Sequence, residues 1–220
     1  MLRTSSARRK RRRPGRPAER SALDSREQLL SAAVELFGQH GVAATTFAMI
    51  ADRAALTPAM LHYYFEDRGH LLDAVVHERM APVIGHVWEP VTADTPPTVL
   101  ISDIVERLLD GIERMPWIPS TWIREVLNEG GALRTRVLEC VPFDKVRIVS
   151  DAIRRQQRAR QLNPNVDPVL IIFSVLGLIM VHCATAGFWA QTFHQKPPNR
   201  AALQRHVTSL LIDGLRGMSK

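Results

Sequence analysis

The sequence lacks the residue patterns that mark most enzymes, metalloproteins and secreted proteins. Its two cysteines, Cys140 and Cys183, fit no metal-binding or redox spacing, and without a secretory signal we expect them to be reduced core thiols in a cytosolic protein. No Gly-x-Ser-x-Gly or phosphate-loop run is present, and His77-Glu78 lacks the second histidine of a zinc-binding helix. We therefore expect no catalytic residues, no metal and no cofactor.

Alternation of apolar and polar residues, which is typical of strands, is also scarce. Hydrophobic residues make up 45% of the 220 positions, and Val, Ile, Leu and Ala dominate without a period of two. Prolines divide the region after residue 80 into further segments of helical character. The pattern predicts an all-α fold of about nine helices.

The net positive charge of the protein comes entirely from the start of the chain. Residues 1–20 hold nine Lys or Arg and one Glu, a net charge of +8, whereas the other 200 residues have a net charge of −1. We expect a disordered basic arm over residues 1–22. Within it "RRRPGRP" (11–17) resembles the core of an AT-hook, so the arm is predicted to contact DNA phosphates or a narrow minor groove, although a solubility role is the alternative. The candidate DNA-binding residues there are Arg11, Arg12, Arg13 and Arg16.

Short helical segments follow the arm. The first is predicted to end at His40, before Gly41, and Pro58 fits the first position of a later helix because its missing N–H costs nothing there. The candidate N-terminal caps, in chain order, are Asp24 or Ser25, Thr46, Thr57 and Asp67. A helix of about eight residues, a turn of about three and a second short helix predict a helix-turn-helix.

The third segment has one apolar face and one face of unusual composition. Leu61, Tyr64 and Phe65 are spaced i, i+3, i+4 and should point inward. The residues left on the outer face are Ala59, Met60, His62 and Tyr63. Rings that face outward on a short helix indicate a binding surface.

The stretch "LLSAAVELFGQHGVAATTFAMIADRAALTPAMLHYYFEDRGHLLDAV" resembles the DNA-binding domain of the TetR family of bacterial transcriptional regulators. The resemblance implies a helix-turn-helix domain over residues 23–70, with residues 57–63 as the recognition helix. It further implies an effector-binding and dimerisation domain over residues 71–220. Thr46 and Thr57 would cap helices and contact phosphates. The remaining implied DNA contacts are Pro58, Ala59 and Met60 near the bases, and His62, Tyr63 and Arg68 at phosphates.

The segment departs from the family pattern in four ways. Ala55 replaces the turn glycine, Pro58 replaces a common lysine, and the order His62-Tyr63 is reversed. Residues 21–79 also hold four basic and eight acidic side chains, a net charge of −4. Our hypothesis is that the basic arm supplies the electrostatic attraction that this domain lacks.

The second half contains one long apolar segment, "DPVLIIFSVLGLIMVHCATAGFWAQ" (167–191), which has no charge over residues 168–190. That length could span a membrane, but a helix apolar all round can also be buried between a core and a partner. The resemblance implies the second case, with helices at about 167–190 and 199–216 forming a four-helix dimer interface. The residues predicted for this seam are Gly177, Val181, Ala184, Leu211 and Leu215.

Large aromatic side chains suggest a ligand cavity, although a Trp in a helical domain is more often core. The candidates for its lining are Trp88, Met115, Trp117, Trp122 and Phe143. Arg124, Glu125 or His182 would provide a polar anchor.

The sequence thus predicts a homodimeric repressor of the bacterial cytoplasm that binds a pseudo-palindromic double-stranded operator. A small apolar or amphipathic effector would release it, with efflux or transport genes as candidate targets. Two alternatives stay open. One is a weakly specific architectural DNA-binding protein without an effector, and the other is a membrane-attached protein that uses residues 168–190.

Overall fold

The structure, a computed structural model, describes residues 18–216, and every regular element in that part is helical. The elements are α1 (Ala18–His40), α2 (Phe47–Arg53), α3 (Pro58–Phe65), α4 (Arg68–Val75), η1 (Val76–Met80), α5 (Ala81–Trp88), α6 (Pro97–Arg114), α7 (Ile118–Thr121), η2 (Trp122–Leu127), α8 (Arg134–Cys140), α9 (Phe143–Arg158), α10 (Leu170–Phe193) and α11 (Arg200–Arg216). The π-helical segment η1 joins α4 to α5, and η2 extends α7. The all-α prediction is confirmed.

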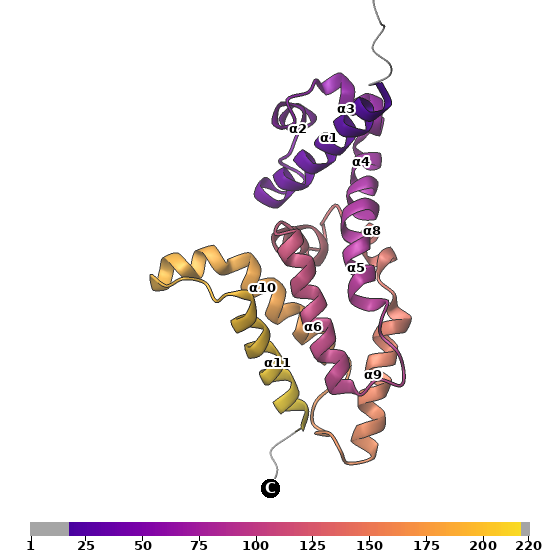
Figure 1. The fold of residues 1–220 in the computed structure, drawn as a ribbon, viewed down its shortest axis with the longest axis vertical. Helices are drawn as coiled ribbons and strands as arrows, with labels where there is room; N and C mark the ends of the chain where they lie inside the picture. Colours follow the sequence, from indigo (N-terminus) through magenta and orange to yellow (C-terminus); the bar gives the residue numbers. More distant parts are fainter. Residues whose placement is uncertain (1–17, 217–220) are drawn as a thin grey trace, which may run out of the picture.

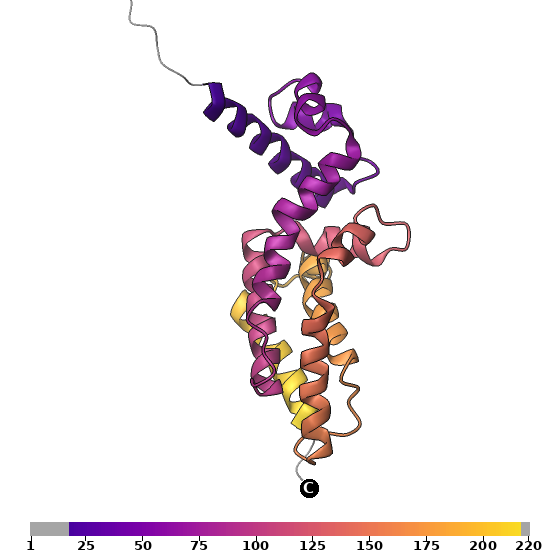
Figure 2. The same cartoon turned by 90° about the vertical axis from the view of Figure 1, so that its right-hand side faces the viewer.

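Two hydrophobic cores divide the described residues. Helices α1, α2 and α3 lie together at one end of the molecule, and the α4–η1–α5 rod runs from them into the larger helical body (Figures 1 and 2). The core of the first group contains the fully buried side chains Leu29, Phe37, Ile50, Leu61 and Leu71. The helical periodicity of these residues is what holds α2 and α3 in a fixed orientation on α1.

Side-chain caps begin two of the short helices, α2 and α4. Thr46 accepts a hydrogen bond from the backbone N–H of Met49 at 3.2 Å, and Asp67 accepts one from the N–H of His70 at 3.0 Å, so both predicted caps are confirmed. Thr57 occupies the N-cap position of α3 with an extended backbone, but its side chain forms no capping bond. The prediction that Thr57 caps through its hydroxyl is therefore wrong, and α3 begins with the preset φ of the proline that follows.

The start of α1 differs from the prediction. The helix begins at Ala18 and not at Asp24 or Ser25, so residues 18–22 belong to α1 and not to a disordered arm. The sequence Ala-Glu-Arg after Pro17 consists of strong helix formers. High helix propensity therefore extends α1 on the N-terminal side of Asp24 and Ser25, the two predicted caps.

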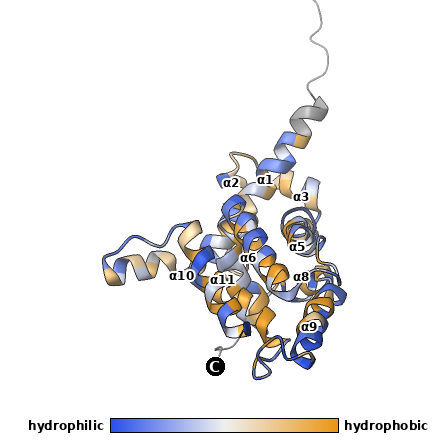
Figure 3. Cartoon of the chain, turned by 60° about the horizontal axis from the view of Figure 1, so that its bottom comes forward, coloured by the Kyte–Doolittle hydropathy of each residue, from blue (hydrophilic) through white to orange (hydrophobic). Residues whose placement is uncertain are grey.

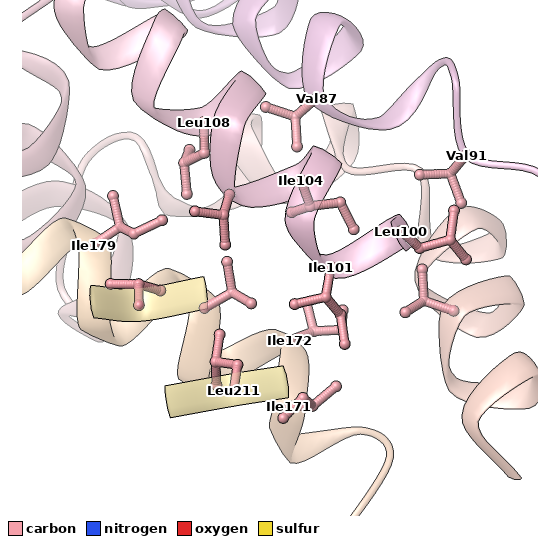
Figure 4. Close-up of a cluster of buried hydrophobic side chains, with 14 of the residues drawn as sticks. Val87, Val91, Leu100, Ile101, Ile104, Leu108, Ile171, Ile172, Ile179 and Leu211 are labelled. Carbon is pink, nitrogen blue, oxygen red and sulfur yellow. The ribbon is translucent and has the colours of Figure 1, made fainter. Parts of the chain in front are cut away.

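The second core is built around α6. Leu100, Ile101, Ile104 and Leu108 of α6 face Ile171, Ile172 and Ile179 of α10 and Leu211 of α11 (Figure 4). Leu211 and Leu215 are 6% and 0% exposed. Both were predicted for a dimer seam, but they pack inside their own subunit and offer no surface to a partner. The apolar stripe of α11 is a core stripe.

The outer half of α10 stands away from the other helices (Figures 1 and 3). Phe188, Trp189 and Phe193 are exposed there, with Phe188 and Trp189 5.1 Å apart edge to face and Trp189 and Phe193 stacked at 5.2 Å. Among the described residues, α10 is the one helix long and apolar enough to cross a membrane, and 28% of its most apolar window is buried. A large apolar face on this helix therefore lacks a partner among residues 18–216.

Candidate DNA-binding surface and ligand cavity

The outer face of α3 carries the rings that the sequence singled out. Leu61 and Phe65 are buried as anchors, while His62 and Tyr63 are exposed, Tyr63 at 79%. Tyr64 is half-buried against the first core. The prediction that His62 and Tyr63 point outward and Leu61 and Phe65 inward is confirmed.

The predicted contact residues around α3 share one exposed surface. Thr46, Thr57, Pro58 and Ala59 are exposed, whereas Met60 is half-buried and packs against the first core. A backbone carbonyl, that of Glu66, lies 3.1 Å from Nδ1 of His62, and the His62 ring lies 5.0 Å from that of Phe47. These contacts restrict the imidazole, so the surface is partly organised before any ligand binds.

The turn between α2 and α3 holds a backbone that usually requires glycine. Ala55 has a φ of +54°, and the turn is closed by hydrogen bonds from Ala55 N–H to Asp52 and from Leu56 N–H to Ala51, at 3.0 and 2.9 Å. A left-handed non-glycine residue costs roughly 1 kcal/mol. Ala55, which stands where the family pattern has a glycine, therefore introduces mild backbone strain into the turn.

The arginines of the helix-turn-helix domain are already engaged within the protein. Arg26 forms two hydrogen bonds with Glu78, at 2.7 and 2.5 Å, and its guanidinium carbon lies 5.1 Å from the centre of the Phe65 ring. The other ion pairs are Arg53–Glu35 at 2.6 Å and Arg79–Glu27. The hydrogen bonds from Arg26 hold the pKa of the Glu78 carboxyl below its usual value. The positive charges of Arg26, Arg53 and Arg79 are thus paired with carboxylates inside the protein.

Arg68 departs from its predicted role. We expected it to reach outward to a phosphate, but its guanidinium donates to the backbone carbonyls of Val42 and Thr45, the latter at 2.9 Å. The carbonyl of Val42 also accepts from the N–H of Thr45 at 3.1 Å, and the charged guanidinium of Arg68 binds both carbonyls at once. Arg68 therefore fixes the loop that leads into α2. Arg11, Arg12, Arg13 and Arg16 lie outside the described residues.

The helical body encloses a cavity of about 400 Å³ beside η2. Three predicted pocket residues, Trp88, Trp122 and Phe143, line it, and so do Gly177 and Val181, which we had assigned to the dimer seam. The other lining residues are Met80, Val83, Ile84, Val87, Ile104, Leu108, Ile118, Val126, Leu127, Arg134, Leu138, Val141, Val146, Ile172, Phe173, Val175, Leu176 and Met180. Apolar side chains dominate this wall, as in ligand cavities generally.

Four residues predicted for the cavity lie elsewhere. Trp117 packs on α1, where a Cβ added to Gly38 would lie 2.8 Å from the Trp117 Cβ. Arg124 donates to the carbonyl of Gln39 at 3.3 Å. His182 turns to the carbonyl of Leu178 on its own helix, and Met115 packs against the second core. Sequence reasoning missed Arg134, the one charged residue in the lining, because only tertiary packing brings it there.

Glu125 joins the cavity wall to the helix-turn-helix domain. Its side chain is 6% exposed, and its two oxygens accept hydrogen bonds from the backbone N–H groups of Val42, at 2.8 Å, and Ala132, at 3.2 Å. The residues on either side of this contact, Trp122 and Val126, line the cavity. A displacement of η2 by a ligand would therefore act directly on the loop between α1 and α2.

Two short helices joined by residues 54–57, with exposed rings on the second, define a helix-turn-helix DNA-binding protein. The sequence model of the family described as "Bacterial regulatory proteins, tetR family" matches residues 29–75. The match covers the helix-turn-helix, which is thus similar to that of TetR-family regulators.

The chain is also similar to named transcriptional regulators. The chain is 26% identical to the HTH-type transcriptional regulator AcrR of Shigella flexneri over 152 residues, which are 67% of this chain and 61% of that protein. A protein of Escherichia coli (strain K12) named "Probable acrEF/envCD operon repressor" is 38% identical over 52 residues, 24% of each chain. The chain thus spans less than two thirds of either relative.

A solved structure has the same fold. The FadR regulator of Bacillus subtilis, determined in complex with stearoyl-CoA, aligns with a TM-score of 0.61 and 17% identity, over 86% of this chain and 98% of that one. The alignment extends the shared fold well beyond the helix-turn-helix into the helical body.

Proposed function

We propose that the protein is a homodimeric transcriptional repressor that binds a pseudo-palindromic operator and leaves it when a small apolar or amphipathic effector enters the cavity. The observation that carries the proposal is the outer face of α3, where His62 and Tyr63 are exposed while Leu61 and Phe65 hold the helix in place. Buried anchors on one face and exposed polar rings on the other are what a recognition helix requires.

The proposed DNA contacts divide by chemistry. Thr46, Thr57, His62 and Tyr63 would bind phosphates, which fix the register of the protein on the duplex. Pro58, Ala59 and Met60 would face base edges, where apolar groups can contact a thymine methyl. Because the arginines of the domain are paired or turned inward, the attraction for DNA would come from Arg11, Arg12, Arg13, Arg16 and the other basic residues of the arm.

The proposed dimer uses the exposed half of α10. The adjoining rings of Phe188, Trp189 and Phe193 form an apolar patch of the kind that marks a protein interface. A second copy related by a twofold axis would cover this patch, together with Ala184 on the same helix. Twofold symmetry would place two recognition helices roughly 34–36 Å apart, one turn of DNA.

The proposed release mechanism runs through η2, which carries cavity residues on one face and Glu125 on the other. An effector that prefers a displaced η2 would weaken the bond from Val42 and move the helix-turn-helix. By linkage, the operator must weaken effector binding by the same factor. A shift from 1:99 to 99:1 requires about 5.5 kcal/mol of differential affinity.

Repression is supported by the E. coli relative that is named as an operon repressor. We keep efflux or transport genes as candidate targets and the cytoplasm as the proposed location. The test is a nuclease footprint on the DNA that flanks the protein's own gene, at fixed salt and with excess random DNA. A repressor keeps a discrete twofold footprint. An architectural DNA-binding protein loses it to the competitor, and that result would refute the proposal.

A further inference from the structure

The cavity has one charged group in an otherwise uncharged wall. Of the residues that line it, only Arg134 carries a formal charge, and the lining includes no Asp or Glu. The guanidinium donates a hydrogen bond to the carbonyl of Leu127, itself a lining residue, at 3.1 Å. An arginine has five N–H donors in a planar fork, so most of its hydrogen-bonding capacity is left over.

Some arginines of the helical body hold a carboxylate counter-ion, and Arg134 is not one of them. Arg136 pairs with Asp73 at 2.5 Å, and Arg200 pairs with Asp110. Among the described residues no carboxylate lies within ion-pair distance of Arg134. A half-buried guanidinium without a counter-ion, beside an apolar space, provides a site for an anion from outside the chain.

The lining residues next to Arg134 are exposed to solvent, whereas others are buried. Arg134 neighbours Leu127 and Leu138, which line the cavity and are exposed, at 58% and 39%. Other lining residues, such as Ile104 and Val175, are fully or nearly fully buried. A bound molecule would therefore place a charged group at the exposed end and an apolar group in the interior.

The cavity volume limits the size of that molecule. If each carbon-sized group takes about the 30 Å³ that a water molecule occupies in the liquid, about 400 Å³ holds roughly thirteen such groups. This is the size of a medium-length alkyl chain or a compact polycyclic body. The wall offers few hydrogen-bond partners for polar groups along its length, so a sugar or peptide would lose its hydration without replacement.

We propose that the cavity binds an anionic amphiphile, with a carboxylate or phosphate held by Arg134 and an apolar portion of about a dozen carbons in the interior. Its role as the effector rests on the proposed function, whereas its binding does not. Arg134 acts as a specificity-determining residue, since a neutral or cationic head gains nothing from the guanidinium.

The experiment uses four probes that share a tetradecyl chain and differ in the head group: tetradecanoate, tetradecyl phosphate, tetradecanol and tetradecyltrimethylammonium. Binding to the full-length protein is followed by quenching of Trp88 and Trp122, which line the cavity. We expect both anions to bind about ten- to a hundredfold more tightly than the alcohol, and the cation least tightly. The relative affinities of the two anions distinguish a carboxylate from a phosphate ligand.

Two variants assign the effect to one residue. Arg134→Gln should weaken both anions by a similar factor and leave tetradecanol unchanged. Arg158→Gln removes the same charge from an exposed position of α9 outside the cavity and should change nothing. Equal affinities for anion and alcohol, or an unchanged anion affinity in Arg134→Gln, would overturn the proposal.

The footprint without any probe separates this inference from the proposed function. A discrete footprint together with unselective probe binding leaves the repressor intact and removes the anionic ligand. Selective anion binding without a footprint supports the anionic ligand and refutes the repressor. If the anions bind selectively and also abolish the footprint, they belong to the effector class.

Discussion

The carboxylate of Glu125 accepts a hydrogen bond from the backbone N–H of Val42, 2.8 Å away, across 83 residues of sequence. The same carboxylate accepts a second bond from Ala132, which precedes α8, the helix that begins with Arg134. One buried side chain thus ties the loop before α2 to the part of the body that carries the anion site. It is a buried, hydrogen-bonded link between the cavity wall and the helix-turn-helix.

Replacing Glu125 with Gln should break one of these two bonds, because an amide has a single acceptor oxygen and its NH2 group would face a backbone N–H. A buried donor left unsatisfied costs about 1–3 kcal/mol, so we expect a loss of that size in the free energy of unfolding. Urea denaturation measures it. The matched control is Glu129→Gln, which changes an exposed residue and should have no effect.

The same variant tests the release mechanism. If Glu125 transmits the effect of a ligand, Glu125→Gln should reduce the factor by which a cavity ligand weakens operator binding, while the ligand still binds. Operator affinity measured with and without ligand gives that factor. A variant that is destabilised but keeps the wild-type factor would show that Glu125 has only a structural role.

The outward hydroxyl of Tyr63 should contribute to DNA binding and not to stability. Removing it in Tyr63→Phe deletes one phosphate hydrogen bond, worth about 0.5–1.5 kcal/mol, so operator affinity should fall about three- to tenfold. The melting temperature should stay unchanged, since the side chain is 79% exposed. Tyr64→Phe, at the half-buried neighbour, is the control. An operator affinity that is unaffected in Tyr63→Phe would remove this residue from the interface.

Local spacing was enough to predict the recognition helix. Leu61 and Phe65 are one helical turn apart, and burying them forces His62 and Tyr63 outward whatever the rest of the chain does. The roles that sequence could not supply depend on distant partners. Arg68 looked like a phosphate contact until the carbonyls of Val42 and Thr45 were seen to receive it.

The same limit explains the errors in the second half of the chain. An apolar stripe that faces its own core and one that faces a partner have the same periodicity, so Leu211 and Leu215 were assigned to the wrong surface. Gly177 and Val181 were assigned to the dimer seam on a similar apolar pattern, but they line the cavity. Arg134 could not be found because nothing local distinguishes it from a solvated surface arginine.

Deleting residues 1–16 should reduce the salt dependence of DNA binding. These residues hold eight basic side chains, and each neutralised phosphate adds about 0.9 to the slope of log affinity against log salt. The slope should therefore fall in magnitude by up to about seven, with a loss of affinity at low salt. Titrations at several salt concentrations measure it. An unchanged slope would exclude the arm from DNA binding, despite the engagement of the arginines in the domain itself.

The Arg26–Glu78 pair should make stability depend on pH in the acid range. The pKa of Glu78 is lowered in the folded protein, chiefly by its hydrogen bonds with Arg26. A lowered carboxyl pKa stabilises the fold above the unfolded value of about 4.3, and this contribution disappears as the pH falls through the folded pKa. At neutral pH, Glu78→Gln should lose up to about 1 kcal/mol, since the pair is partly exposed.

The difference in unfolding free energy between wild type and Glu78→Gln should therefore shrink toward zero below about pH 4. Denaturation curves at a series of pH values measure it. Glu89→Gln, at an exposed carboxylate of α5's C-terminal end, should differ little from wild type at any pH. A constant difference for Glu78→Gln across the series would contradict an ionic origin.

A substitution of Trp189 tests whether a second copy of the chain covers the exposed half of α10. Its ring lies between Phe188 and Phe193, and a carboxylate placed there would have to be desolvated in an apolar interface, which costs several kcal/mol. Trp189→Glu should therefore convert a dimer into a monomer, as measured by light scattering after gel filtration. Val99→Glu, at an exposed apolar residue of α6, should leave the dimer intact. If instead the wild type is monomeric and sediments with membranes while Trp189→Glu becomes soluble, α10 binds a lipid surface. The dimer, and with it the twofold operator, would then be excluded.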